Sequence, residues 1–164
     1  MTPNLPASVL AHLELSPVED VMLYVLRDAF PDLSIRSLLS TDPEFPLVLV
    51  RRSPGLGESD GDPRFVDAAI VDVHVFAQDP DGDEAAALIS EAVRVALRNA
   101  WLAHARVPGR GSIIKVAMTS TPHRSPDWAT SSGPVQYADL PAGTWRYEAS
   151  YHVTIRKERK PAQG

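Results

Sequence analysis

The chain has 164 residues and a mass of 17.8 kDa, and 44% of its residues are hydrophobic and 23% charged, which is an ordinary globular composition. It has 0 cysteines, which excludes disulfides, thiolate metal sites, iron–sulfur clusters and cysteine nucleophiles. Its formal net charge of -5 is unsuited to wrapping nucleic acid. No apolar run approaches the roughly 20 residues that span a bilayer, and the N-terminus lacks the basic start of a secretory signal. We therefore expect a soluble, intracellularly made single domain.

The N-terminal region predicts an arm followed by a helix. Residues 1–15 are a prolyl, weakly amphipathic lead-in, and they can form a short helical turn or an arm that docks on a neighbour through Val9, Leu10 and Leu13. Ser16-Pro17-Val18-Glu19 then has the pattern of a capping box, in which the Ser16 hydroxyl and the Glu19 carboxylate satisfy free backbone amides. We expect this capped helix to run from about residue 17 to residue 30.

The remaining elements are strands around one long helix. Short β-branched or alternating runs predict strands at 34–40 (weak), 46–52, 65–77, 112–121 and 144–157. Acidic, turn-rich loops are expected at 53–63 and 79–84, and the second of them starts a helix over about 82–105. The expected apolar arc of this helix holds Leu88, Ile89, Ala92, Val93, Val95, Ala96, Leu102 and Ala103.

We expect the core to form between the last strand and the long helix. Trp145, Tyr147, Tyr151 and Val153 are expected to pack against Leu88, Ala92 and Val95. The order of elements favours an α+β fold: a mostly antiparallel sheet of four to five strands, with the long helix packed on one face and a capped N-terminal helix. The expected layout is an arm at 1–15, one domain at 16–157 and a flexible tail at 158–164.

Few residues suggest catalysis or metal binding. Metalloprotease, serine-hydrolase and P-loop motifs are absent from the sequence, and we predict no catalytic, cofactor-binding or metal-binding residues. Asp79, Asp81 and Asp83 fail the spacing of a calcium-binding EF-hand, so a solvated helix start is favoured over a loose calcium site. Arg110 lies between two glycines and suits a mobile turn or a phosphate contact.

Two features point to interactions with other proteins. Residues 122–143 have no periodicity, and long loops of this kind inside compact domains are often functional. This loop carries Trp128 and Tyr137, residue types that anchor protein interfaces. Trp101 falls with Arg94 and Arg98 on the polar side of the long helix. Trp101 can contact another protein there, and a buried partner within its own subunit is an equal alternative. The hypothetical interface residues are thus Arg94, Arg98, Trp101, Trp128 and Tyr137.

The strand sequences resemble those of a known family. After the N-terminal helix come Phe45-Pro46-Leu47-Val48-Leu49-Val50-Arg51-Arg52, the strand Val71-Asp72-Val73-His74-Val75-Phe76-Ala77, an Ala-rich helix, and the closing Trp145-Arg146-Tyr147-Glu148-Ala149-Ser150-Tyr151-His152-Val153-Thr154-Ile155-Arg156. Over about residues 17–157 this order resembles the tail-terminator proteins of long-tailed (siphovirus-type) phages, in particular those of actinobacterial hosts. The resemblance rests on strand patterns rather than on catalytic signatures.

This resemblance implies a subunit of a ring, usually a hexamer, on the head-proximal end of the tail tube. The ring stops tube polymerisation and joins the neck, so the implied partners are copies of the chain, the tail-tube protein and a neck or head-completion protein. DNA only passes through the lumen, where acidic charge lets it slide, and no membrane is involved. The protein is expected in the virion after assembly in the host cytoplasm. The alternatives are a head-completion, stopper or tail-tube ring protein or, from a different class, a small ligand-binding or enzymatic α+β domain.

Overall fold

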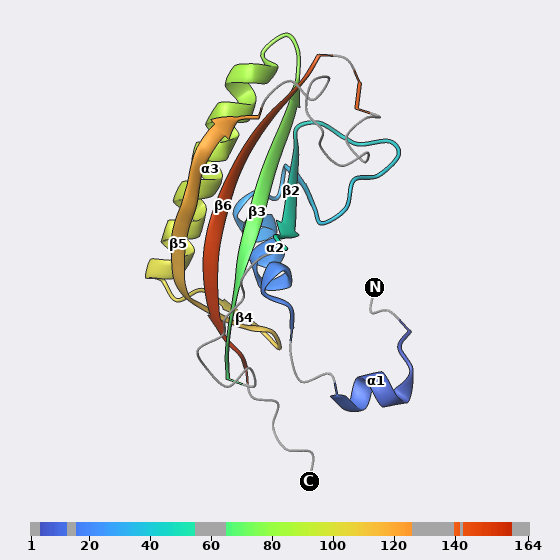
Figure 1. Cartoon of the computed structure of the whole chain (residues 1–164), viewed down its shortest axis with the longest axis vertical. Coiled ribbons are helices and arrows are strands. Elements are labelled where there is room, and N and C mark those ends of the chain that lie inside the picture. Colours follow the sequence, from blue (N-terminus) through green and yellow to red (C-terminus); the bar gives the residue numbers. More distant parts are fainter. Residues whose placement is uncertain (1–3, 13–15, 55–64, 126–139, 142, 159–164) are drawn as a thin grey trace.

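A computed structural model describes residues 4–12, 16–54, 65–125, 140–141 and 143–158. A curved sheet carries two helices on one face, and a third, short helix stands apart from it (Figure 1). The elements follow in the order α1 (Ala7–His12), α2 (Val18–Ala29), β1 (Ser34–Arg36), β2 (Leu47–Arg52), β3 (Val66–Gln78), α3 (Gly82–Leu102), β4 (Arg106–Val107), β5 (Gly111–Arg124) and β6 (Thr144–Arg156).

The sheet has six strands in the order β1-β2-β3-β6-β5-β4. All neighbouring pairs are antiparallel except β1 and β2, which are parallel. The α+β class and the long helix on one face are therefore confirmed. The sheet exceeds the expected four to five strands because β4, only 2 residues long, pairs with the start of β5.

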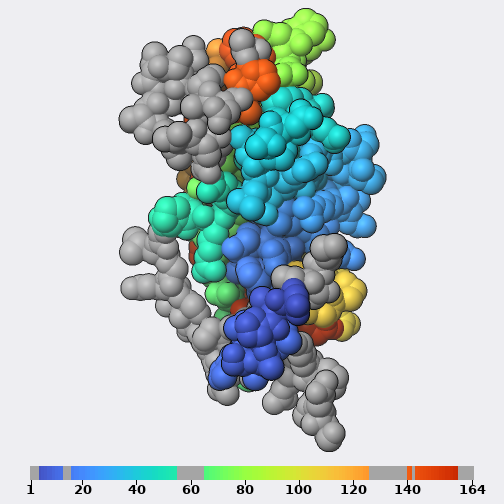
Figure 2. Space-filling model, turned by 90° about the vertical axis from the view of Figure 1, so that its right-hand side faces the viewer, coloured from blue at the N-terminus to red at the C-terminus, as the bar shows by residue number. Residues whose placement is uncertain are grey.

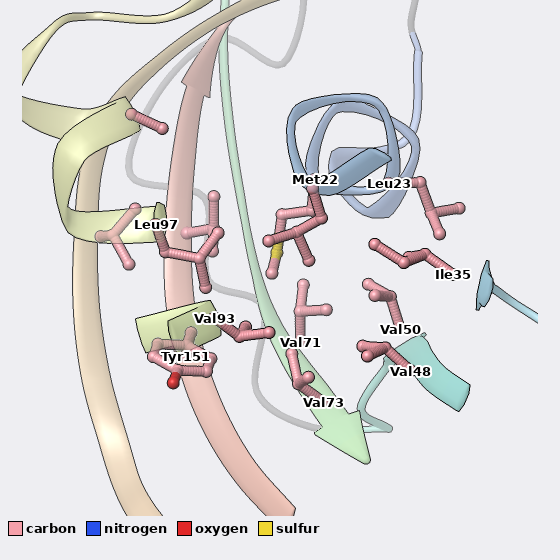
Figure 3. Close-up of a cluster of buried hydrophobic side chains, with 14 of the residues drawn as sticks. Met22, Leu23, Ile35, Val48, Val50, Val71, Val73, Val93, Leu97 and Tyr151 are labelled. Atoms are coloured by element: carbon pink, nitrogen blue, oxygen red, sulfur yellow. The ribbon is translucent and has the colours of Figure 1, made fainter. Parts of the chain in front are cut away.

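The main core lies between the sheet and helices α2 and α3. Residues of β3 and β6 alternate between the two faces, as their sequence pattern predicts, and Val73 lies opposite Ala149 in the register. Met22 from α2 and Leu97 from α3 point at the same sheet face (Figure 3). Fully or almost fully buried members of this core include Val18, Val21, Leu26, Val48, Val50, Val71, Val93, Ile113, Tyr151, Val153 and Ile155.

A smaller apolar cluster covers part of the opposite sheet face. It contains Leu47, Leu49 and Phe76 from β2 and β3, together with Leu140. Leu39 and Phe45, from the segment before β2, pack against it. The strand pair β2–β3 is therefore buried on both faces at this end, which explains the continuous apolar run in β2.

The N-terminal helix is present without its predicted side-chain cap. α2 begins at Val18, its N-cap residue is Pro17, and no side chain caps it. Pro17 adopts an extended conformation with ψ 146°, and this places Ser16 one residue too far from the first turn to act as the N-cap. The capping-box expectation for Ser16 and Glu19 is therefore wrong, although the helix itself is confirmed.

The buried face of the long helix overlaps only partly with the predicted one: Val93 is buried and Ile89 and Ala96 pack against the core as expected. Its buried positions are Gly82, Ala86, Ser90, Val93, Leu97 and Ala100, whereas Leu88, Ala92, Val95, Leu102 and Ala103 are exposed. Small residues allow the helix to approach the sheet closely at its N-terminal half, and the Ser90 hydroxyl is satisfied by donating to the Ala86 carbonyl oxygen at 2.8 Å. The expected contacts of Leu88, Ala92 and Val95 with the core are therefore wrong. Tyr151 and Val153 are buried as predicted, and Trp145 and Tyr147 are partly buried.

Strand boundaries also differ from the prediction at two places. The weak strand at 34–40 is limited to Ser34–Arg36. β5 extends to Arg124, so the first residues of the predicted 122–143 loop belong to a strand. Residues 126–139 and 142, which include Trp128 and Tyr137, lie outside the described residues.

Candidate functional site

An apolar groove runs between the C-terminal half of α2 and the outer side of α3. Its volume is about 700 Å³, and its apolar lining includes Val25, Ala29, Ala92, Val95, Ala96 and Ala103. Two acidic residues, Asp28 from α2 and Glu91 from α3, also line it. Because Ala92, Ala96 and Ala100 of α3 have small side chains, the groove has room for larger apolar side chains from outside.

The exposed face of α3 continues this apolar surface. Leu88, Val95 and Leu102 follow one another at intervals of seven residues and are 62%, 53% and 57% exposed. Positions seven apart lie on nearly the same side of a helix, so the three side chains form one stripe. Val95 belongs both to this stripe and to the groove lining. A continuous exposed apolar surface of this kind marks a site for protein association.

A second exposed apolar surface belongs to the short helix α1. Val9 and Leu10 are 43% and 54% exposed, and the helix has no buried residue. Within the described part of the chain, α1 contacts no other helix or strand, and it lies on the outside of the molecule below α2 (Figure 2). Its one side-chain contact there joins His12 Nδ1 and the Ser8 carbonyl oxygen at 2.8 Å.

The sheet face away from α2 and α3 carries polar side chains that pair with each other. His74 Nδ1 lies 3.4 Å from Glu148 Oε2, and His123 Nε2 lies 3.4 Å from Glu148 Oε1. The His74 imidazole, helped by Ser125 and Arg146, lowers the pKa of Glu148 to about 2. The same face holds a hydrogen bond from Ser150 Oγ to Asp72 Oδ1 at 2.6 Å. The ion pair of Lys157 with Asp67, at 3.3 Å, involves a β3 residue that alternation places on the opposite face, with Val71 and Val73.

The acidic residues before α3 are engaged within the fold. Asp79 Oδ1 accepts the indole N–H of Trp145 at 2.6 Å. Asp83 accepts hydrogen bonds from Arg124 and from the Tyr147 hydroxyl. These contacts favour the structural interpretation of the acidic turn over a calcium site, and the described residues contain no group of three or more His, Asp or Glu placed to hold a metal ion.

The predicted interface residues fall on different parts of the structure. Arg94 is exposed and pairs with Glu91 at 3.4 Å, and Arg98 is exposed one turn further along α3. Trp101 is partly buried and packs against the main core of its own subunit. Arg110, the possible phosphate contact, pairs with Asp20 at 3.2 Å.

Sequence reasoning missed the groove, because it depends on how α2 and α3 pack against each other. The seven-residue spacing of Leu88, Val95 and Leu102 was the available signal, but these residues were assigned to the core. In the part of the chain that the structure describes, no helix has the length and apolar character needed to cross a membrane. Comparison of the sequence with known protein families and with curated proteins finds no match.

Proposed function

We propose that the chain is a structural subunit of a phage tail: a ring-forming tail terminator that caps the tail tube, stops its polymerisation and joins it to the head or neck. The observation that carries this proposal is the apolar surface formed by the α2–α3 groove and the Leu88, Val95 and Leu102 stripe. Exposed apolar side chains that are grouped in this way are removed from water when a protein partner binds over them. The resemblance of β2, β3 and β6 to tail-terminator strands indicates that this partner is another copy of the chain or a protein of the tail or neck.

The two ends of the sheet differ in how much backbone edge they leave open. The edge strands are β1, with 3 residues, and β4, with 2 residues. Among the described residues, β4 pairs only with Gly111 and Ser112, so most of the 14-residue strand β5 has no strand partner on its outer side. The subunit therefore offers a partner both the apolar face of its helices and an open strand edge.

The paired polar face supports a structural role. Glu148 has a pKa of about 2 and is therefore charged at neutral pH, where it cannot donate a proton. His74, Arg146 and Ser125 are engaged with this carboxylate or with each other. These residue types often act in acid–base catalysis, but here their side chains form contacts between neighbouring strands.

The partners in this proposal are further copies of the chain, usually six in a ring, the tail-tube protein and a neck or head-completion protein. DNA passes through the lumen of the ring without being bound. The net charge of -5 supports this last point, because an acidic ring repels phosphates and lets DNA slide. In this proposal the protein resides in the neck of the virion.

A polymerisation assay tests the proposal. The tail-tube protein encoded by the same genome is allowed to polymerise alone and with this chain at a substoichiometric ratio, and tube growth is followed by light scattering. A terminator arrests growth at a ratio of about one ring per tube. Growth that continues at the same rate to the same final scattering would contradict the proposal.

The groove also gives a specific reason to test a second function. Its volume of about 700 Å³ falls within the roughly 300–1,000 Å³ range of small-molecule sites. A small apolar ligand-binding domain would bind an environment-sensitive apolar dye as a monomer, and Val95→Glu would abolish this signal. A ring protein would instead lose dye binding as the subunits associate.

A further inference from the structure

We propose that α1 of one copy docks in the α2–α3 groove of a second copy, so that each subunit donates one arm and accepts another. The inference deepens the proposed ring by naming the contact between subunits. The inference rests on the proposed function in one respect, which is that copies of the chain must associate. The occupant is a defined segment, residues 4–12, and the receiving surface is the groove that Val95 and its neighbours line.

The arm needs a partner that its own domain does not provide. α1 has only 6 residues, and isolated helices shorter than about 12 residues are marginal in water. Packing of an apolar face is what normally stabilises so short a helix. Yet Val9 and Leu10 are largely exposed, and α1 contacts no other helix or strand among the described residues.

The groove suits a short helix in size and in shape. Two helices form its walls, and its α3 wall, from Glu91 to Ala100, is longer than the arm helix. The alanines at positions 92, 96 and 103 leave space that the side chains of Val9 and Leu10 would fill. This is the helix-in-groove mode of recognition, in which an amphipathic helix lays its apolar side chains between two others.

Charge and placement favour the arm of a second copy. Residues 4–12 contain no acidic residue, so their approach to Asp28 and Glu91 of the groove meets no like-charge repulsion. The chain's own arm projects from the opposite side of the molecule to α3 (Figure 1). Because donor and acceptor are different surfaces, each copy can give its arm to one neighbour and receive an arm from another, and such head-to-tail contacts close into rings when the rotation permits; reciprocal exchange between two copies would give a dimer instead.

Disulfide trapping tests this contact directly, since the chain has 0 cysteines. Leu10→Cys and Val95→Cys are introduced in separate full-length proteins, which are mixed and mildly oxidised. Arm exchange predicts a covalent heterodimer that forms at least tenfold faster than either homodimer. The matched control replaces Val95→Cys by Leu38→Cys, another exposed apolar position, 73% exposed and outside the groove lining; this mixture should give only background dimer.

A double variant, Leu10→Cys with Val95→Cys in one chain, separates the possible occupants. Exchange between copies predicts a ladder of covalent oligomers. A compact monomer with an internal disulfide would show that the arm folds onto its own groove, and equal rates in the Val95→Cys and Leu38→Cys mixtures would show no specific docking; either result overturns the proposal. Trapping in a protein that fails to arrest tube growth would leave arm exchange standing and remove only the tail-terminator function.

Discussion

His74 and Glu148 lie directly opposite each other on β3 and β6, with Nδ1 of the imidazole 3.4 Å from Oε2 of the carboxylate. The side chain of His74 is 13% exposed and that of Glu148 is 31% exposed. The pair sits in the centre of the sheet on the face away from α2 and α3. It therefore links the protonation state of this polar face to the stability of the pairing between β3 and β6.

The low pKa of Glu148 predicts an acid-sensitive contribution to stability. Its pKa of about 2 in the folded protein lies below the ordinary value of 4.5, so the folded state binds fewer protons than the unfolded state. The contribution is present above pH 4.5 and is lost as the pH falls towards 2. Glu148→Gln should flatten the fall in unfolding free energy over this window, as measured by urea denaturation at several pH values. Equal slopes for the variant and the wild type would contradict the assignment.

Gly82 predicts a steric limit at the start of α3. A Cβ atom at this position would lie 2.5 Å from Trp145 Cδ1 and 2.9 Å from the Ala77 carbonyl oxygen. Because the second contact is with backbone, the neighbour cannot simply rotate away. Gly82→Ala should destabilise the protein by about 1–3 kcal/mol, despite the higher helix propensity of alanine. Unchanged thermal stability would show that α3 does not approach β3 this closely.

A matched pair of leucines tests which face of α3 is buried. Leu97 is fully buried and Leu88 is 62% exposed. Leu97→Ala should lower the free energy of unfolding by about 2–5 kcal/mol, whereas Leu88→Ala should change it by no more than about 0.5 kcal/mol. Chemical denaturation of the two variants gives both values. The opposite ranking would restore the helix orientation that the sequence predicts.

Tyr151 combines a well-packed ring with a hydroxyl that has no hydrogen-bond partner in the described part of the chain. Burial raises the pKa of this hydroxyl to about 12. Tyr151→Phe removes the buried polar atom and should leave stability unchanged or increase it by up to about 1 kcal/mol. Tyr151→Ala should lower stability by about 3–5 kcal/mol. A large loss in the phenylalanine variant would mean that the hydroxyl is hydrogen-bonded.

Regular alternation made the long strands predictable. The predicted strand at 144–157 matches β6, and the one at 65–77 matches β3 to within one residue at each end. The period of two in a half-buried strand is visible in the sequence alone, because successive side chains face opposite sides. By contrast, β4 has 2 residues, too few to leave a pattern, and it exists because it pairs with β5.

The orientation of α3 was not predictable in this way. The predicted apolar arc is broad and includes both Val93, which is buried, and Leu88 and Val95, which are exposed. The buried side instead carries small residues such as Ala86 and Ser90, which allow close packing on the sheet. The candidate site lies on the side that was misassigned, so it could be recognised only after α2 and α3 were placed together. Trp101 falls on the polar side by periodicity, with a partner in the same subunit left open, and it is this second alternative that its packing against the core supports.

Electron microscopy of the purified chain mixed with tail tubes tests the central claim most directly. The account predicts a closed ring, alone or as a cap on one end of each tube, and tubes of uniform length. Tubes with bare ends, together with a chain that stays at its monomer mass of 17.8 kDa, would contradict it.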